Sequence, residues 1–107
     1  QALEADNNFS EMLPNEFALN QNYPNPFNPS TNLKFALKER AITTLEIFNI
    51  LGESVHTVVD ESLGAGYYNY RIDMNGYASG MYFYKLTVTN ESGAQLYNSM
   101  KKMILLQ

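Results

Sequence analysis

Residues 81–89 read Met-Tyr-Phe-Tyr-Lys-Leu-Thr-Val-Thr, a run of aromatic and β-branched side chains that favours an extended strand. Side chains alternate between the two faces of a strand, so every second residue shares a face. One face here carries Tyr82, Tyr84, Leu86 and Val88. The following Asn-Glu-Ser-Gly, residues 90–93, has the composition of a hairpin turn with Gly93 in the left-handed conformation. We therefore predict that residues 94–106 return as the antiparallel partner strand.

Further strands are expected upstream, at the short and regular spacing of a sandwich. Their predicted ranges are 31–37, 42–50, 54–60 and 67–74. Gly52 and Gly80 fall in the connecting loops, where a β-carbon is costly, so we give both a structural role. The pattern predicts an all-β, immunoglobulin-like antiparallel β-sandwich of about seven strands, without helices. A small barrel is the alternative.

Three prolines within six residues mark the segment before the first of these strands. Proline lacks an N–H and restricts the residue before it, so a helix or a central strand is excluded there. We predict a stiff, ordered loop, with Tyr23 and Phe27 fixing it to the body of the domain. The segment reads Tyr23, Pro24, Asn25, Pro26, Phe27, Asn28 and Pro29.

Composition excludes several functions. The chain has 107 residues, enough for one domain with one core, and a net charge of −4, which disfavours a general nucleic-acid binder. No apolar run is long enough to span a membrane. Cysteine is absent and His56 is the only histidine. We therefore expect no cofactor, no metal site and no catalytic site, and we expect that the protein is not an enzyme. Residues 1–12 are polar and acidic, and we predict a flexible linker there, followed by a domain over residues 13–107.

Four motifs occur in an order that resembles one known family. The first is residues 19–31, LNQNYPNPFNPST; the second is residues 45–55, LEIFNILGESV; the third is residues 78–86, with Gly80 and Tyr82 in a Gly-x-Tyr pattern; the last is Lys101-Lys102 before an apolar run. Together they resemble the type A C-terminal sorting domains of the bacterial type IX secretion system. The later motifs are also similar to the immunoglobulin-like domain of the flagellar hook-capping protein.

This resemblance implies a secretion signal that another protein recognises. The upstream cargo domain would be in cis, joined through residues 1–12, and the partners would be a receptor of the secretion machinery and a sortase-like peptidase. The implied route runs through the periplasm to the cell surface or the extracellular space, with cleavage in or before residues 1–14. If residues 94–106 form an edge strand, a receptor strand can pair with it. Lys101 and Lys102 would then either contact an acidic receptor or only protect the edge.

Two other functions remain open from the sequence. The chain is alternatively a structural immunoglobulin-like accessory module of an extracellular enzyme. It is also, less favourably, a carbohydrate-binding module in which exposed tyrosines stack on sugars, although cross-strand aromatic packing explains the same residues. That tyrosine group is Tyr67, Tyr68, Tyr70, Tyr82 and Tyr84.

Overall fold

A computed structural model describes residues 13–107, so the predicted linker over residues 1–12 lies outside the described residues. Within the described part, the chain forms seven strands and no helix. The strands are β1 (Ala18–Leu19), β2 (Ser30–Leu37), β3 (Ala41–Phe48), β4 (Ser54–Leu63), β5 (Gly66–Asp73), β6 (Gly80–Thr89) and β7 (Gln95–Leu105).

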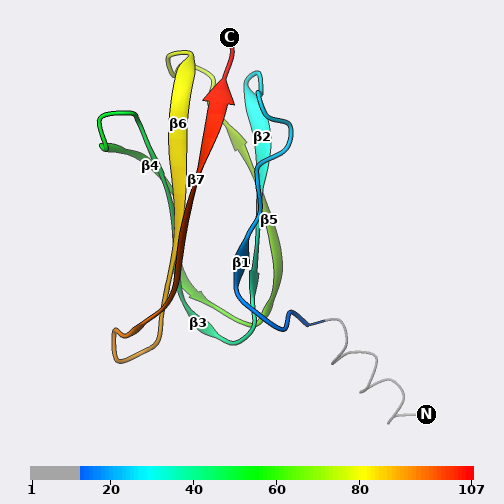
Figure 1. The fold of residues 1–107 in the computed structure, drawn as a ribbon, viewed down its shortest axis with the longest axis vertical. Helices are drawn as coiled ribbons and strands as arrows, with labels where there is room; N and C mark the ends of the chain where they lie inside the picture. Colours follow the sequence, from blue (N-terminus) through cyan, green and yellow to red (C-terminus); the bar gives the residue numbers. More distant parts are fainter. Residues whose placement is uncertain (1–12) are drawn as a thin grey trace, which may run out of the picture.

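The strands form two antiparallel sheets that face each other (Figure 1). The three-stranded sheet has the order β1-β2-β5, and the four-stranded sheet has the order β4-β3-β6-β7. This confirms the predicted sandwich and excludes the barrel, because a barrel would be one closed sheet. β7 lies at the edge of the four-stranded sheet, as β-augmentation requires.

The core lies between the sheets and follows the alternation expected from the sequence. The side chains of Leu33, Phe35 and Leu37 from β2 meet the inward side chains of β3, β6 and β7. Tyr82, Tyr84, Leu86 and Val88 are all buried, which confirms the predicted inner face of β6. Burial of these large side chains is the main force that holds the sheets together, because the chain has no disulfide.

The predicted last residue was wrong for both β3 and β4. β3 ends at Phe48, two residues early, because the Asn49 side-chain oxygen accepts hydrogen bonds from the backbone N–H groups of Leu51 (2.9 Å) and Glu53 (3.0 Å). This side-chain cap begins the turn at Asn49. β4 continues to Leu63, three residues beyond the prediction, because its pairing with β3 contains two register shifts that accommodate extra residues. β1 is only two residues long and was not predicted.

Candidate functional site

The proline motif and the three residues before it, together residues 20–29 and named the Pro-rich segment from here on, connect the edges of the two sheets. On one side, the backbone of Tyr23 pairs with Asn32 of β2. On the other side, the backbone N–H of Phe27 donates to Ile104 (2.9 Å), and the C=O of Phe27 accepts from Leu106 (2.9 Å). The segment therefore continues the four-stranded sheet by one short parallel bridge beside β7. Figure 1 shows this loop and the C-terminal end of β7 at the same end of the sandwich.

The two aromatic residues of the segment have different roles. Phe27 is 2% exposed and belongs to the core, as predicted. The prediction for Tyr23 was wrong: its side chain is 77% exposed, and only its backbone attaches the loop. Sequence pattern did not separate the two, because each aromatic residue precedes or follows a proline in similar surroundings.

A buried hydrogen-bond network holds the segment in place. The side-chain amide of Asn22 donates to Thr31 Oγ1 (3.0 Å) and to the C=O of Pro24 (3.1 Å). The Thr31 hydroxyl donates to the same Pro24 carbonyl (2.7 Å). Asn22 and Thr31 are both buried, so these bonds satisfy polar groups that water cannot reach. Sequence reasoning gave neither residue a role, although both flank the proline motif.

Tyr84 of β6 joins this network to the four-stranded sheet. Its hydroxyl donates to the C=O of Asn20 (2.7 Å) and accepts from the backbone N–H of Asn22 (2.7 Å). The ring is completely buried, and burial raises the pKa of the Tyr84 phenol to about 12, against the opposing effect of the Asn22 hydrogen bond. Tyr84 is therefore a core residue whose one polar atom positions the start of the Pro-rich segment.

Replacing Tyr84 with phenylalanine is expected to lower the free energy of unfolding by about 1–3 kcal/mol, because the buried N–H of Asn22 and the partly buried C=O of Asn20 lose their partner. Since the folded pKa lies above the ordinary value, the wild-type chain loses stability as pH rises from about 10 to 12. The variant should lack this part of the loss and keep only the part from Tyr70, whose pKa is also raised, mainly by burial. Urea denaturation at pH 8 and pH 11 measures both effects, and an unchanged pH slope would contradict the assignment.

The edge of β7 is hydrogen-bonded to the Pro-rich segment at its C-terminal end, and further along β7 Phe17 stacks on Tyr97 with ring centroids 5.9 Å apart. The backbone N–H of Ile104 donates to Asn25 Oδ1 (3.0 Å), and the C=O of Lys102 accepts from Gln21 Nε2 (2.8 Å). The outward backbone groups alternate along an antiparallel edge strand, so those of Met100 and Asn98 point the same way. Within residues 13–107, no turn or loop backbone reaches the outward groups of these two residues. This stretch of edge is available for another strand.

Next to this free edge, the outer face of the four-stranded sheet is partly apolar. Met100 is 58% exposed and borders two neighbouring hollows together with Phe83. One hollow, about 330 Å³, also touches Gln21 of the Pro-rich segment. The other, about 300 Å³, extends over Phe48 and Lys85. We call the free edge and this flank the β7 surface: Phe48, Phe83, Lys85, Asn98, Met100 and Lys102.

Lys101 and Lys102 leave β7 on opposite faces, since successive side chains of a strand alternate. Lys102 is exposed on the outer face, whereas Lys101 is half-buried on the side of Met103 and Leu105. Both border the hollow beside Gln21. A charged side chain directed inward at a sheet edge hinders indiscriminate strand pairing, so Lys101 suits edge protection and Lys102 suits partner contact.

The remaining motif residues lie in structural positions. Gly52 (φ +83°) and Gly80 (φ +147°) have backbone conformations that side chains disfavour, which explains the glycines at these loops. The Tyr82 hydroxyl donates to the C=O of Ala78 (2.6 Å), and its ring belongs to the core. Asn25 is engaged with Ile104, whereas Pro24, Pro26 and Asn28 are exposed on the outside of the segment.

The five tyrosines do not form a common platform for sugars, and the favoured explanation, aromatic packing, is confirmed for four of them. Tyr82 and Tyr84 are buried, and Tyr68 and Tyr70 stack on Phe35 with ring centroids 5.1 and 5.8 Å apart. These four rings therefore serve packing, and only Tyr67 of the group is exposed.

His56 lies exposed on β4 at a hollow of about 240 Å³ that Asp73 also borders. The Asp73 carboxylate accepts instead from the backbone N–H of Asn75 (2.9 Å). Across residues 13–107, no group of three acidic, histidine or cysteine side chains is placed to hold a metal ion. In the same part of the chain, no helix has the length and apolar character needed to cross a bilayer.

These features define a class of protein: a β-sandwich domain with an accessible sheet edge beside an ordered, hydrogen-bonded Pro-rich segment, suited to recognition by another protein. Residues 21–105 match the family of secretion system C-terminal sorting domains, and the chain belongs to that family. This confirms the family indicated by the four motifs. Membership indicates a C-terminal sorting signal of the type IX kind, interaction with the secretion machinery, and export to the cell surface or the extracellular space.

Among solved structures, the chain is similar to CopC from Methylosinus trichosporium OB3b. The two are 16% identical, the match covers 84% of this chain and 93% of that chain, and the TM-score is 0.49. No curated protein matches the chain.

Proposed function

We propose that this domain directs an upstream cargo protein from the periplasm across the outer membrane, and that a receptor of the type IX machinery recognises its β7 surface. The family match over residues 21–105 carries the proposal. In this proposal the domain has no catalytic role, and a sortase-like peptidase separates it from the cargo in or before residues 1–14 during attachment to the cell surface.

The recognition step is a β-strand addition. A receptor strand pairs with the outward backbone groups of Asn98 and Met100, where the Pro-rich segment no longer covers the edge. Phe83 and Met100 offer apolar contacts beside the new strand, and Lys102 offers a charge for an acidic receptor side chain. Gln21 already binds the C=O of Lys102, so this group is not available to the receptor strand. The covered part of the edge therefore limits the pairing of the receptor strand to the residues that precede Lys102.

The Pro-rich segment supports recognition indirectly, through its own packing against the domain. Its core residue Phe27 and the network around Asn22 hold it against the C-terminal end of β7. Exposed Asn28 is one of the side chains of the segment, with that of Tyr23, that are available for direct receptor contact. Most of the motif thus acts by shaping the edge that the receptor uses.

The proposal is tested by fusing residues 1–107 to the C-terminus of a periplasmic reporter in a bacterium with a type IX system. We expect the reporter at the cell surface or in the medium, and in the periplasm when the domain is omitted or the secretion machinery is deleted. A fusion that folds, by protease resistance of the domain, but stays in the periplasm would contradict the proposal. That result would favour the accessory-module alternative.

A further inference from the structure

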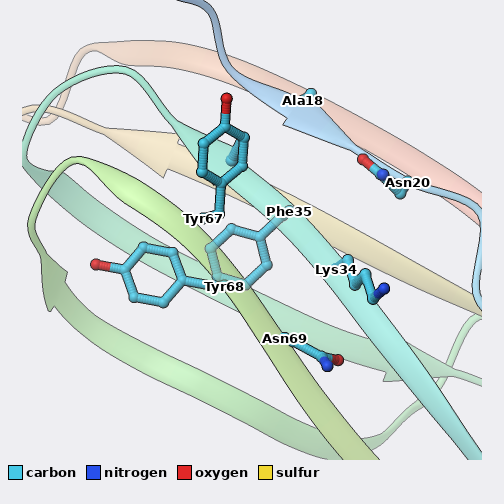
Figure 2. Close-up of a pocket in the computed structure, with 8 residues that line it drawn as sticks. Ala18, Asn20, Lys34, Phe35, Tyr67, Tyr68 and Asn69 are labelled. Atoms are coloured by element: carbon cyan, nitrogen blue, oxygen red, sulfur yellow. The ribbon is translucent and has the colours of Figure 1, made fainter. Parts of the chain in front are cut away.

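The outer face of the three-stranded sheet contains a hollow of about 380 Å³ (Figure 2). Six side chains of its lining form two cross-strand rows on adjacent strands. Ala18, Ala36 and Tyr67 make up one row, and Asn20, Lys34 and Asn69 make up the other.

The first row is an apolar step. Ala18 and Ala36 are small, whereas Tyr67 beside them is 69% exposed and stands out from β5 (Figure 2). The aromatic ring of Tyr67 therefore stands above the neighbouring part of the surface, which the methyl groups of Ala18 and Ala36 form. An exposed aromatic ring next to a low apolar floor offers its face to a flat ligand with C–H groups.

The second row is polar and carries one positive charge. Asn20, Lys34 and Asn69 are all exposed, and Figure 2 shows Lys34 and Asn69 directly beside each other on neighbouring strands. Lys34 is the one charged residue in the described lining. The two amides can donate and accept hydrogen bonds, and the ammonium favours an anion.

A sugar ring that bears a carboxylate matches both rows. Its C–H face can stack on Tyr67 over the alanine floor, its hydroxyls can bond to Asn20 and Asn69, and its carboxylate can pair with Lys34. An extended peptide fits less well, because strand pairing is possible only at β1 and β5, the two edges of this sheet, and not at β2 between them, so a paired peptide would lie beside the hollow and not in it.

We propose that this hollow is a binding site for an acidic saccharide, with a hexuronic acid residue as the unit recognised. Tyr67 stacks on the ring, Lys34 binds the carboxylate, and Asn20 and Asn69 bind hydroxyls. The site lies on the three-stranded sheet, whereas the β7 surface lies on the four-stranded sheet.

Titration of the 107-residue chain with an oligogalacturonate, followed by NMR, tests the proposal. We expect saturable shifts of the side-chain amides of Asn20 and Asn69. Tyr67→Ala should weaken binding about ten-fold through the lost stacking, and Lys34→Gln should weaken it and reduce its salt dependence. Tyr67→Trp should bind like the wild type, and this result would show that the site requires an aromatic ring for stacking.

Matched controls separate this site from general effects. Tyr23→Ala removes a similarly exposed tyrosine on the Pro-rich segment, and Lys102→Gln removes an exposed lysine on the other sheet. Both variants should bind like the wild type. Equal binding of polyglutamate would overturn the proposal, because charge alone would explain it. Equal binding of maltohexaose would overturn the role of Lys34, and the absence of shifts at millimolar oligogalacturonate would overturn the site.

Discussion

Replacement of Phe27 with alanine is expected to lower the free energy of unfolding by about 3–5 kcal/mol, a large part of the total stability of a domain of this size. Phe27 is 2% exposed and contributes its ring to the core between the sheets. Removal leaves a cavity at the point where the Pro-rich segment meets the end of β7. The melting temperature should fall by roughly 15 °C or more. Urea denaturation of purified wild-type and variant chains measures the change.

Tyr23→Ala is the matched control, because it removes a similar volume from the same segment. The Tyr23 side chain is 77% exposed, so we expect a change within about 0.5 kcal/mol. The backbone pairing of Tyr23 with Asn32 does not depend on the side chain. Equal losses for the two variants would show that the segment is not packed as described, and a loss below about 1 kcal/mol for Phe27→Ala would contradict its core position.

The contrast between Phe27 and Tyr23 also shows what sequence pattern can predict. Period-two alternation gives the inner face of β6 correctly, because Tyr82, Tyr84, Leu86 and Val88 face a core through a regular strand. The Pro-rich segment has no period, so the direction of each aromatic residue depends on tertiary contacts. Burial of Phe27 is decided by its bridge to Leu105, which is 78 positions away along the chain.

The supporting network could not be derived for the same reason. A hydrogen bond joins Asn22 to Tyr84, which lies 62 positions further along the chain. The residues around either one give no indication of the other. An asparagine before Tyr-Pro indicates a turn from sequence alone. Its burial, and the pKa of Tyr84, arise only when β6 and the segment are brought together. The edge position of β7 is likewise only a condition when the sequence is taken alone, and the strand order of the four-stranded sheet establishes it.

The β3–β4 turn shows a local limit of the same kind. The apolar pattern continues through Ile50 and predicts a strand that extends to this residue. Ile50 is 69% exposed, because β3 ends at Phe48 and the Asn49 side chain begins the turn. A polar residue that can bond to the backbone two positions on outweighs an apolar neighbour at a strand end.

Substitution of Met100 by proline is expected to abolish export of a reporter fused to the chain while leaving the domain folded. The backbone N–H of Met100 points away from β6 at the free edge, where proline is tolerated. A receptor strand would lose this donor and meet the proline ring, so export should fall at least about ten-fold. The exported fraction of the fusion, compared with its protease resistance, measures both parts.

Two control substitutions distinguish the loss of the Met100 backbone N–H from the loss of the Met100 side chain and from unfolding of the domain. Met100→Ala keeps the N–H and removes the side chain, so it should reduce export less than proline does. Ser99→Pro places the same ring one position earlier, where the N–H faces Leu86 of β6, and should destabilise the domain by about 3 kcal/mol or more. Normal export of folded Met100→Pro would exclude strand addition at this edge. Equal loss for Met100→Ala and Met100→Pro would instead assign recognition to the apolar flank.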